Sequence, residues 1–238
     1  MAELAEVVTG LESFLTSMRA AADELVDVAE ATLTARPQPR RTDLTEVERV
    51  VRRRLGEREE VVHGGGVVAA PGVLTDAPWW LEWFAWDAGV VQRLVSDTDP
   101  TGAHFFDYTL MPWFAGPRDR PSPAGTVTGP YVDYLCTDDY TITFTQAVRR
   151  PDGSFAGVAG VDVRVLAVED AFLAELCATG RLLVLVNTLG RVVVSTSARM
   201  LSGGLVHEVD VPALFSSGDP RLTRLAGCEI GLLDLGPR

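Results

Sequence analysis

The pattern of apolar and polar positions begins with one long amphipathic helix. Apolar residues recur at steps of three and four over about eight turns, the spacing of a single helical face. The run Arg36-Pro37-Gln38-Pro39 ends this helix, because proline lacks the amide donor and restricts the residue before it. The apolar stripe consists of Leu4, Val7, Val8, Leu11, Phe14, Leu15, Met18, Ala22, Leu25, Val26, Ala29 and Leu33.

A second helix is predicted to start near Thr45. Thr45 and Glu48 have the spacing of a capping box, and apolar residues continue at helical steps to Leu55. We interpret Gly64-Gly65-Gly66 as the stop of this helical register, because it lacks the Lys-Ser/Thr that a phosphate-binding loop requires.

From Val67 onward the pattern changes to extended strands. The segment from Trp79 to Trp86 alternates with period two, so its side chains divide between two faces. Core packing is one role for these tryptophans, although they also supply more indole donors than a core commonly needs. One face carries Trp80, Glu82, Phe84 and Trp86, and the other carries Trp79, Leu81, Trp83 and Ala85.

The second half of the chain predicts further antiparallel strands. Residues 140–148 alternate, a turn follows at 151–153, and residues 155–165 return as a strand of small residues. Residues 168–178 have helical composition, and 182–187 and 191–197 form a hairpin. Beyond Leu201 the glycine, proline and aspartate breaks are too frequent for a prediction of elements.

These elements indicate an α+β fold. We expect a PAS-like antiparallel sheet flanked by the long N-terminal helix and by covering helices, with residues 104–120 as the cover. The predicted domains are a helical region at 1–62, a ligand-binding module at 63–180 and a strand-containing region at 181–238. That last region is either a truncated second module or a set of strands that completes the first sheet.

Charge and composition narrow the classes of partner. The 238 residues carry a formal charge of −12, from 33 acidic and 21 basic residues, which disfavours nucleic acid. Arg52-Arg53-Arg54 lies among glutamates and is typical of a mixed-charge helix face. The N-terminus lacks the basic residues of a signal peptide, and no window approaches the ~20 apolar residues of a membrane span. We therefore expect a soluble, cytoplasmic protein.

A search for catalytic and metal-binding motifs finds none. His63, His104 and His207 are far apart, and no histidine pair has the spacing of metal ligands. The three cysteines are odd in number and widely spaced, so neither a disulfide framework nor a zinc knuckle is indicated. We expect no enzyme activity, no metal and no cofactor.

Between His104 and Val165 the chain has an aromatic segment ending in Pro112-Trp113-Phe114, two strands joined at Pro151-Asp152-Gly153, and a single carboxylate in the second of these strands. This arrangement resembles the Cache family of small-molecule sensor domains. In amino-acid-binding members of that family, an aromatic motif holds Tyr, Arg, Trp and Tyr. The corresponding places here are Phe106, Met111, Trp113 and Phe114, and a later Tyr and Asp correspond to Tyr131 and Asp162. The resemblance implies that the half of the site that holds an amine is present, whereas the arginine that clamps a carboxylate is replaced by Met111.

Asp162 carries most of the binding hypothesis. It is a lone carboxylate among small and apolar strand neighbours, and such a group is costly to bury without a partner. A ligand ammonium is one possible partner; backbone amides or an arginine are another. The predicted ligand-binding residues are Tyr108, Trp113, Phe114, Tyr131, Asp133 and Asp162.

The predicted function is a sensor that binds an amine or another cationic metabolite and signals to a separate regulator protein. The alternatives are a sensor of amino acids or small carboxylates, a structural or dimerising domain without ligand, and an enzyme acting on a small amine. The N-terminal helices either pair two subunits in a homodimer or pack only on their own domain.

Overall fold

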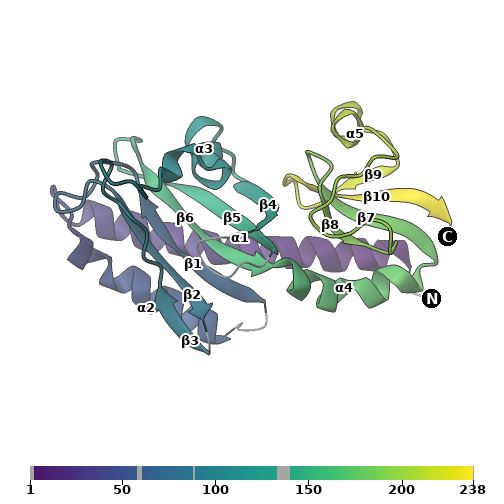
Figure 1. The fold of residues 1–238 in the computed structure, drawn as a ribbon, viewed down its shortest axis with the longest axis horizontal. Helices are drawn as coiled ribbons and strands as arrows, with labels where there is room; N and C mark the ends of the chain where they lie inside the picture. The colour runs from purple at the N-terminus through teal and green to yellow at the C-terminus, as the bar shows by residue number, and fades with distance from the viewer. Residues whose placement is uncertain (1–2, 58–60, 88, 133–139, 238) are drawn as a thin grey trace.

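The computed structural model describes residues 3–57, 61–87, 89–132 and 140–237. Within these ranges the strands form two antiparallel sheets that lie side by side (Figure 1). The first sheet consists of β1 (Val62–Ala69), β2 (Trp80–Asp87), β3 (Val90–Arg93), β4 (Thr126–Val132), β5 (Tyr140–Arg149) and β6 (Phe155–Arg164), in the order β3-β2-β1-β6-β5-β4. The second consists of β7 (Arg181–Asn187), β8 (Val192–Ser195), β9 (Leu222–Arg224) and β10 (Ile230–Pro237), in the order β8-β7-β10-β9.

The N-terminal helix α1 (Leu4–Thr34) backs both sheets (Figure 1). Its predicted stripe is buried: Leu11 and Leu25 are each 1% exposed. One continuous core joins this stripe to Phe144 and Val161 of the first sheet and to Leu185 of the second. The stripe therefore packs on the chain's own sheets.

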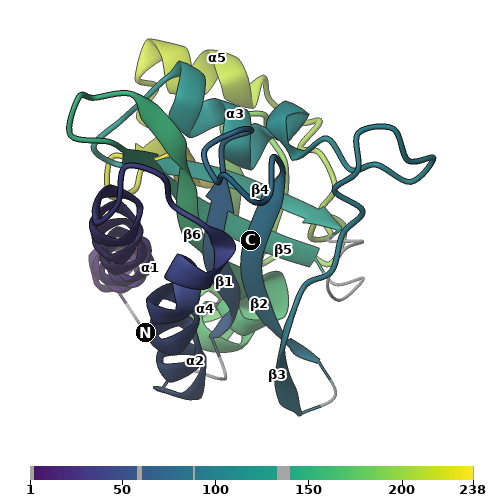
Figure 2. The same ribbon diagram turned by 90° about the vertical axis from the view of Figure 1, so that its left-hand side faces the viewer.

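The second helix, α2 (Thr45–Glu57), follows a short 3-10 turn, η1 (Arg41–Leu44), and lies beside α1 on the same side of the first sheet (Figure 2). Its arginines form the predicted mixed-charge face. Arg52 pairs with Glu48 at 2.8 Å, and both Arg53 and Arg54 pair with Glu24 of α1. The guanidinium groups therefore join the two helices.

The interpretation of Gly64-Gly65-Gly66 as a helix stop is wrong. All three glycines lie in β1, a buried strand with a partner on each side. A Cβ on Gly66 would lie 2.1 Å from the carbonyl oxygen of Glu82, so only glycine lets β2 approach this closely. The glycines serve close strand packing and do not end the helix.

The other face of the first sheet is covered by the predicted segment. It forms the 3-10 turn η2 (Tyr108–Leu110) and the helix α3 (Pro112–Asp119). The two faces of β2 divide as predicted, since Phe84 joins the core under α1 whereas Trp83 joins the cluster under α3. The α+β, PAS-like architecture predicted from the sequence is confirmed.

The second sheet repeats this layering at smaller scale. The helix α4 (Val165–Ala178) leads from β6 into β7, and α5 (Val211–Ser217) covers the face that points away from α1. The predicted hairpin is the pair β7 and β8, and it belongs to the second sheet. The alternative in which these strands complete the first sheet is therefore wrong, whereas the predicted domain boundaries stay a prediction.

Among the described residues, no helix has the length and apolar character needed to cross a lipid bilayer. Cys177 and Cys228 are both only partly buried. Cys136 lies outside the described residues.

Candidate functional site

Asp162 lies at the centre of a buried polar network on the face of the first sheet that α3 covers. The residue is 4% exposed. Its Oδ2 accepts a hydrogen bond from the indole Nε1 of Trp83 at 2.7 Å, and its Oδ1 accepts one from the Thr143 hydroxyl at 2.6 Å. Both of these donors are neutral side chains, and each fixes one carboxylate oxygen.

Tyr131 extends the network by one step. Its hydroxyl lies 2.6 Å from the Thr143 hydroxyl. Because Thr143 has a single proton and gives it to Asp162, Tyr131 must be the donor in this contact. These hydrogen bonds run in series from Tyr131 through Thr143 to the carboxylate, so a substitution at Tyr131 alters the hydrogen bonding of Asp162.

Strand register explains why these residues meet. Asp162 in β6 stands opposite Thr143 in β5 and opposite Gly64 in β1, and the three share one face of the sheet. A Cβ on Gly64 would lie 3.0 Å from Oδ2 of Asp162. Glycine at this position therefore leaves room for the carboxylate beside β1.

The aromatic cover is anchored by Tyr108 and Phe114. Tyr108 is fully buried; its hydroxyl donates to the carbonyl oxygen of Ala69 at 2.8 Å and accepts from the amide of Trp80 at 3.1 Å. Phe114 is 1% exposed, and its ring centroid lies 5.3 Å from that of Tyr108. These two side chains hold the cover on the sheet, and their predicted contact with a ligand stays a prediction.

Burial raises the pKa of Tyr108 to about 12, from 10.0 in an exposed tyrosine. The unfolded chain loses this proton near pH 10 and the folded chain retains it until about pH 12. We therefore expect the free energy of unfolding to fall between these two pH values, and the fall to be smaller in Tyr108→Phe. Urea titrations at a series of pH values check this. The same dependence of the unfolding free energy on pH in the wild type and in Tyr108→Phe would contradict it.

Trp113 occupies the boundary between this network and solvent. Its ring centroid lies 6.5 Å from that of Trp83, and its carbonyl oxygen accepts a hydrogen bond from Thr145 at 2.8 Å. The structure thus brings the predicted residues Trp113, Tyr131 and Asp162 together around Trp83 and Thr143. Asp133 lies outside the described residues.

Trp83 and Thr143 were not among the predicted ligand-binding residues. Their strands alternate clearly, and both fall on the same face as Asp162. The surplus of indole donors in β2 was the signal for Trp83, whereas Thr143 could be recognised only from the register of β5 and β6.

Trp113 and Tyr131 also line a cleft between the two sheets. This inter-sheet cleft has a volume of about 540 Å³ and is bounded by α3 and β4 on one side and by the turn between β7 and β8 on the other. Asn187, the last residue of β7, donates to the carbonyl oxygen of Gly129 at 2.7 Å, which joins the end of β7 to β4. The cleft is therefore built from parts of both sheets.

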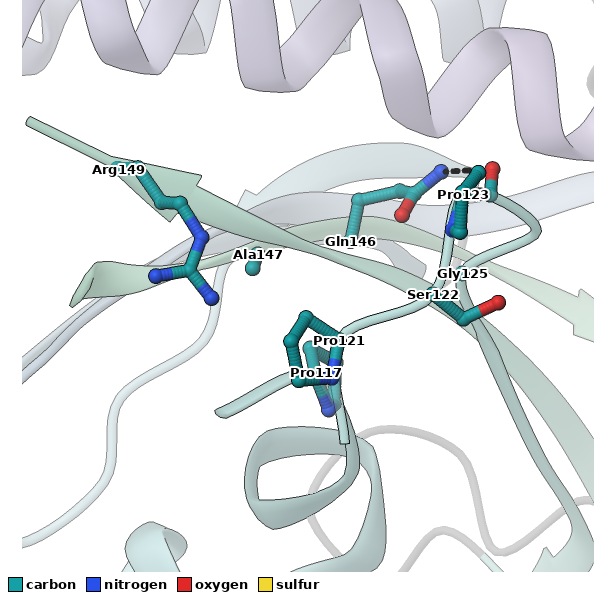
Figure 3. Close-up of a pocket in the computed structure, with 8 residues that line it drawn as sticks. All are labelled: Pro117, Pro121, Ser122, Pro123, Gly125, Gln146, Ala147 and Arg149. Atoms are coloured by element: carbon teal, nitrogen blue, oxygen red, sulfur yellow. Dashed lines mark hydrogen bonds between the residues drawn. The ribbon is translucent and has the colours of Figure 1, made fainter. Parts of the chain in front are cut away.

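A second hollow lies near the C-terminal end of α3 and is shown in Figure 3. Its volume is about 290 Å³, and Gln146 donates there to the carbonyl oxygen of Pro123 and to Asp23 of α1. None of the predicted binding residues lines it. Its walls are Pro117, Pro121, Ser122, Pro123, Gly125, Gln146, Ala147 and Arg149.

Among the described residues, no group of three or more His, Cys, Asp or Glu side chains could hold a metal ion. His63 is buried and its Nε2 lies 3.2 Å from the Arg164 guanidinium, an arrangement typical of a structural histidine.

Comparison with solved structures identifies the fold. A methyl-accepting chemotaxis protein X matches with a TM-score of 0.70 at 15% identity, over 98% of this chain and 94% of the other. The ligand-binding domain of the chemoreceptor Tlp3 of Campylobacter jejuni, in complex with L-valine, matches with a TM-score of 0.62 at 15% identity, over 98% and 89%. The extracellular domain of a protein described as a histidine kinase matches with a TM-score of 0.68 at 15% identity, over 97% and 92%.

No family model matches the sequence, and no curated protein matches it either. The matching structures are described as chemoreceptors or as ligand-binding, sensory or extracellular domains, and none of them is described as a catalytic domain. The resemblance to Cache sensors predicted from the sequence is confirmed at the level of the fold, and the chain has the architecture of chemoreceptor and histidine-kinase sensor domains.

Proposed function

We propose that this chain is a small-molecule sensor whose ligand places an ammonium group against the Asp162 network. The observation that carries the proposal is the buried carboxylate of Asp162, oriented by Trp83 and Thr143 on the face of the sheet that the aromatic segment covers. We infer ligand sensing from the fold, because the structures that match nearly the whole chain include ligand-binding domains.

The chemistry of the network favours a cation. A carboxylate that Trp83 and Thr143 help to hold in place pairs strongly with an ammonium, and this pairing is stronger in a site from which water is excluded. Trp83 and Trp113 lie next to each other beside the carboxylate, and aromatic faces attract a positive charge through their quadrupoles. A primary amine or a quaternary ammonium satisfies both features.

An α-amino acid is the second candidate ligand. Two solved structures of the matching chemoreceptor Tlp3 contain L-valine and L-norvaline. In this chain the nearby Arg118 is already paired with Asp119, at 2.7 Å, and its guanidinium lies over the Phe114 ring. An amino-acid carboxylate would therefore have to use another group, which is why we favour a ligand without one.

A sensor also needs an output. The homodimer and the separate regulator protein predicted from the sequence stay predictions, as does the cytoplasmic location. The matching structures come from chemoreceptors and from proteins described as histidine kinases, which is why we expect an output to a signalling protein.

The proposal is tested by a thermal-shift screen of the purified chain against amines, betaines, amino acids and small carboxylates. A ligand present at 100 times its Kd stabilises the folded state by about 2.7 kcal/mol, which is readily seen as a rise in Tm. We expect shifts with cationic compounds. Shifts produced only by amino acids would favour the second candidate, and the absence of any shift would favour a purely structural domain.

A further inference from the structure

The inter-sheet cleft has features of a binding site that the Asp162 network does not use. Its volume of about 540 Å³ lies within the range of ~300–1,000 Å³ that is common for small-molecule sites. One wall comes from the first sheet and its cover, with Trp113 and Arg120, and the other comes from the second sheet, with Asn187 and Arg191. A molecule bound there would contact both halves of the chain.

Two arginines bring uncommitted positive charge to this cleft. Arg120 forms no ion pair with any described residue, and within the same described ranges the Arg191 guanidinium donates only to the carbonyl oxygen of Gly203. Asp119 also lines the cleft, but Arg118 already pairs with it through two contacts, at 2.7 and 2.9 Å. The acidic side chain nearest to Arg120 in the sequence is therefore already neutralised.

Glu229 is the remaining charged group in the cleft wall. Its Oε2 accepts a hydrogen bond from the amide of Val127 at 3.2 Å, and it forms no ion pair within the described part of the chain. The uncommitted charges of the cleft are thus two guanidinium groups and one carboxylate, a net positive charge. This is a local departure from a chain whose formal charge is −12, and it selects for an anion.

We propose that the inter-sheet cleft is a second ligand site, and that it binds a small organic carboxylate between Arg120 and Arg191. The planar guanidinium group is suited to a carboxylate, because two of its N–H groups can donate to the two oxygens in parallel. Trp113 and Asn187 add an apolar wall and an amide. The site is distinct from the ammonium site proposed above, although Tyr131 and Trp113 belong to the walls of both.

The shared wall makes the two sites neighbours in the same structure. Tyr131 lines the cleft and also donates to Thr143, whose proton goes to Asp162. A carboxylate that contacts Arg120 on one side and Arg191 on the other would also hold β4 close to the second sheet. Occupancy of the cleft would therefore stabilise one arrangement of the two sheets, which is what a sensor that transmits a signal requires.

The test is calorimetric titration of the whole chain with acetate, succinate and citrate, and with succinamide as the uncharged analogue. We expect at least one carboxylate to bind and succinamide not to bind. Arg120→Gln and Arg191→Gln should each weaken that binding about 10-fold or more, because each removes a charge-assisted contact. Arg120→Lys keeps the positive charge but cannot donate two parallel hydrogen bonds to one carboxylate. Its affinity for the carboxylate should therefore lie between those of the wild type and Arg120→Gln.

Arg199→Gln is the matched control, because Arg199 is an exposed arginine of the second half of the chain that does not line the cleft. Circular dichroism checks that every variant is folded. The proposal is overturned if none of the three carboxylates binds at millimolar concentration, if succinamide binds as well as succinate, or if Arg199→Gln weakens binding as much as the cleft variants do.

These titrations, taken together with the thermal-shift screen against cations, separate this proposal from the ammonium site. Carboxylate binding that depends on Arg120 and Arg191 supports the cleft even if no cation binds at Asp162. Cation binding without any carboxylate binding supports the ammonium site and overturns the cleft.

Discussion

Replacing Asp162 with asparagine is expected to raise the Kd of a cationic ligand by about 30-fold or more. The substitution removes the negative charge and keeps the shape, and losing one partner of a buried charge pair costs about 2–5 kcal/mol. Trp83 and Thr143 donate to different carboxylate oxygens, and in asparagine an NH2 group replaces one of these oxygens, so one of the two donors loses its acceptor. We therefore also expect the variant to lose about 1–3 kcal/mol of stability.

Calorimetric titration of wild type and variant with the same cation measures this effect. Asp234→Asn is the matched control: Asp234 is also a strand carboxylate, pairs with Arg181 at 2.7 Å and lies in the second sheet. It should change stability and leave cation binding unchanged. Equal Kd values for wild type and Asp162→Asn would show that the carboxylate only shapes the sheet.

Gly160→Ala is expected to destabilise the fold by about 3 kcal/mol. Gly160 lies in the middle of β6, and a Cβ there would lie 2.1 Å from the carbonyl oxygen of Phe144 in β5. This neighbour is backbone, so it can move only if two paired strands separate. Overpacking of a buried strand pair therefore cannot be relieved by a change of rotamer.

Urea denaturation checks this, with Gly56→Ala as the control. Gly56 lies in α2, and a Cβ at this position meets nothing within 4 Å. Since alanine has the higher helix propensity, Gly56→Ala should stabilise the chain by about 0.5–1 kcal/mol. A Gly160→Ala variant as stable as wild type would mean that β5 and β6 do not pair in the register described above.

Local periodicity was enough to predict the elements whose burial follows from their own pattern. The stripe of α1 and the two faces of β2 are properties of one helix and one strand, and each was predicted in the place where it is found. The cover over the first sheet was also predicted, because the aromatic run from Phe105 to Phe114 has no other layer in which to bury its rings.

Features that depend on distant segments were missed. Gly64-Gly65-Gly66 resembles a break when only its neighbours in sequence are considered, and its role follows from the backbones of β2 and β6 on either side. Trp83 and Asp162 are 79 positions apart, and only the strand order brings them within 2.7 Å. The candidate site was thus predicted at its carboxylate and missed at the donors that orient it.

The elements beyond Leu201 were not predicted from the sequence. Beyond Leu201 the breaks suggested no elements, yet α5 begins where Asp210 caps the amide of Ala213 and a proline occupies the first turn. That combination is a usual start signal for a helix, but seven residues are too few to show a periodic pattern. The strands β9 and β10 are stabilised by pairing within the second sheet.

The central claim is that a positive charge on the ligand is recognised at Asp162. The most direct measurement is calorimetric titration of the wild-type chain with the cation that gives the largest thermal shift, and with an uncharged analogue of the same shape. We predict that the cation binds at least about 10-fold more tightly than its analogue, as expected for a charge pair with adjacent aromatic rings. Equal affinity for the two compounds, or no binding by any cation, would contradict the claim.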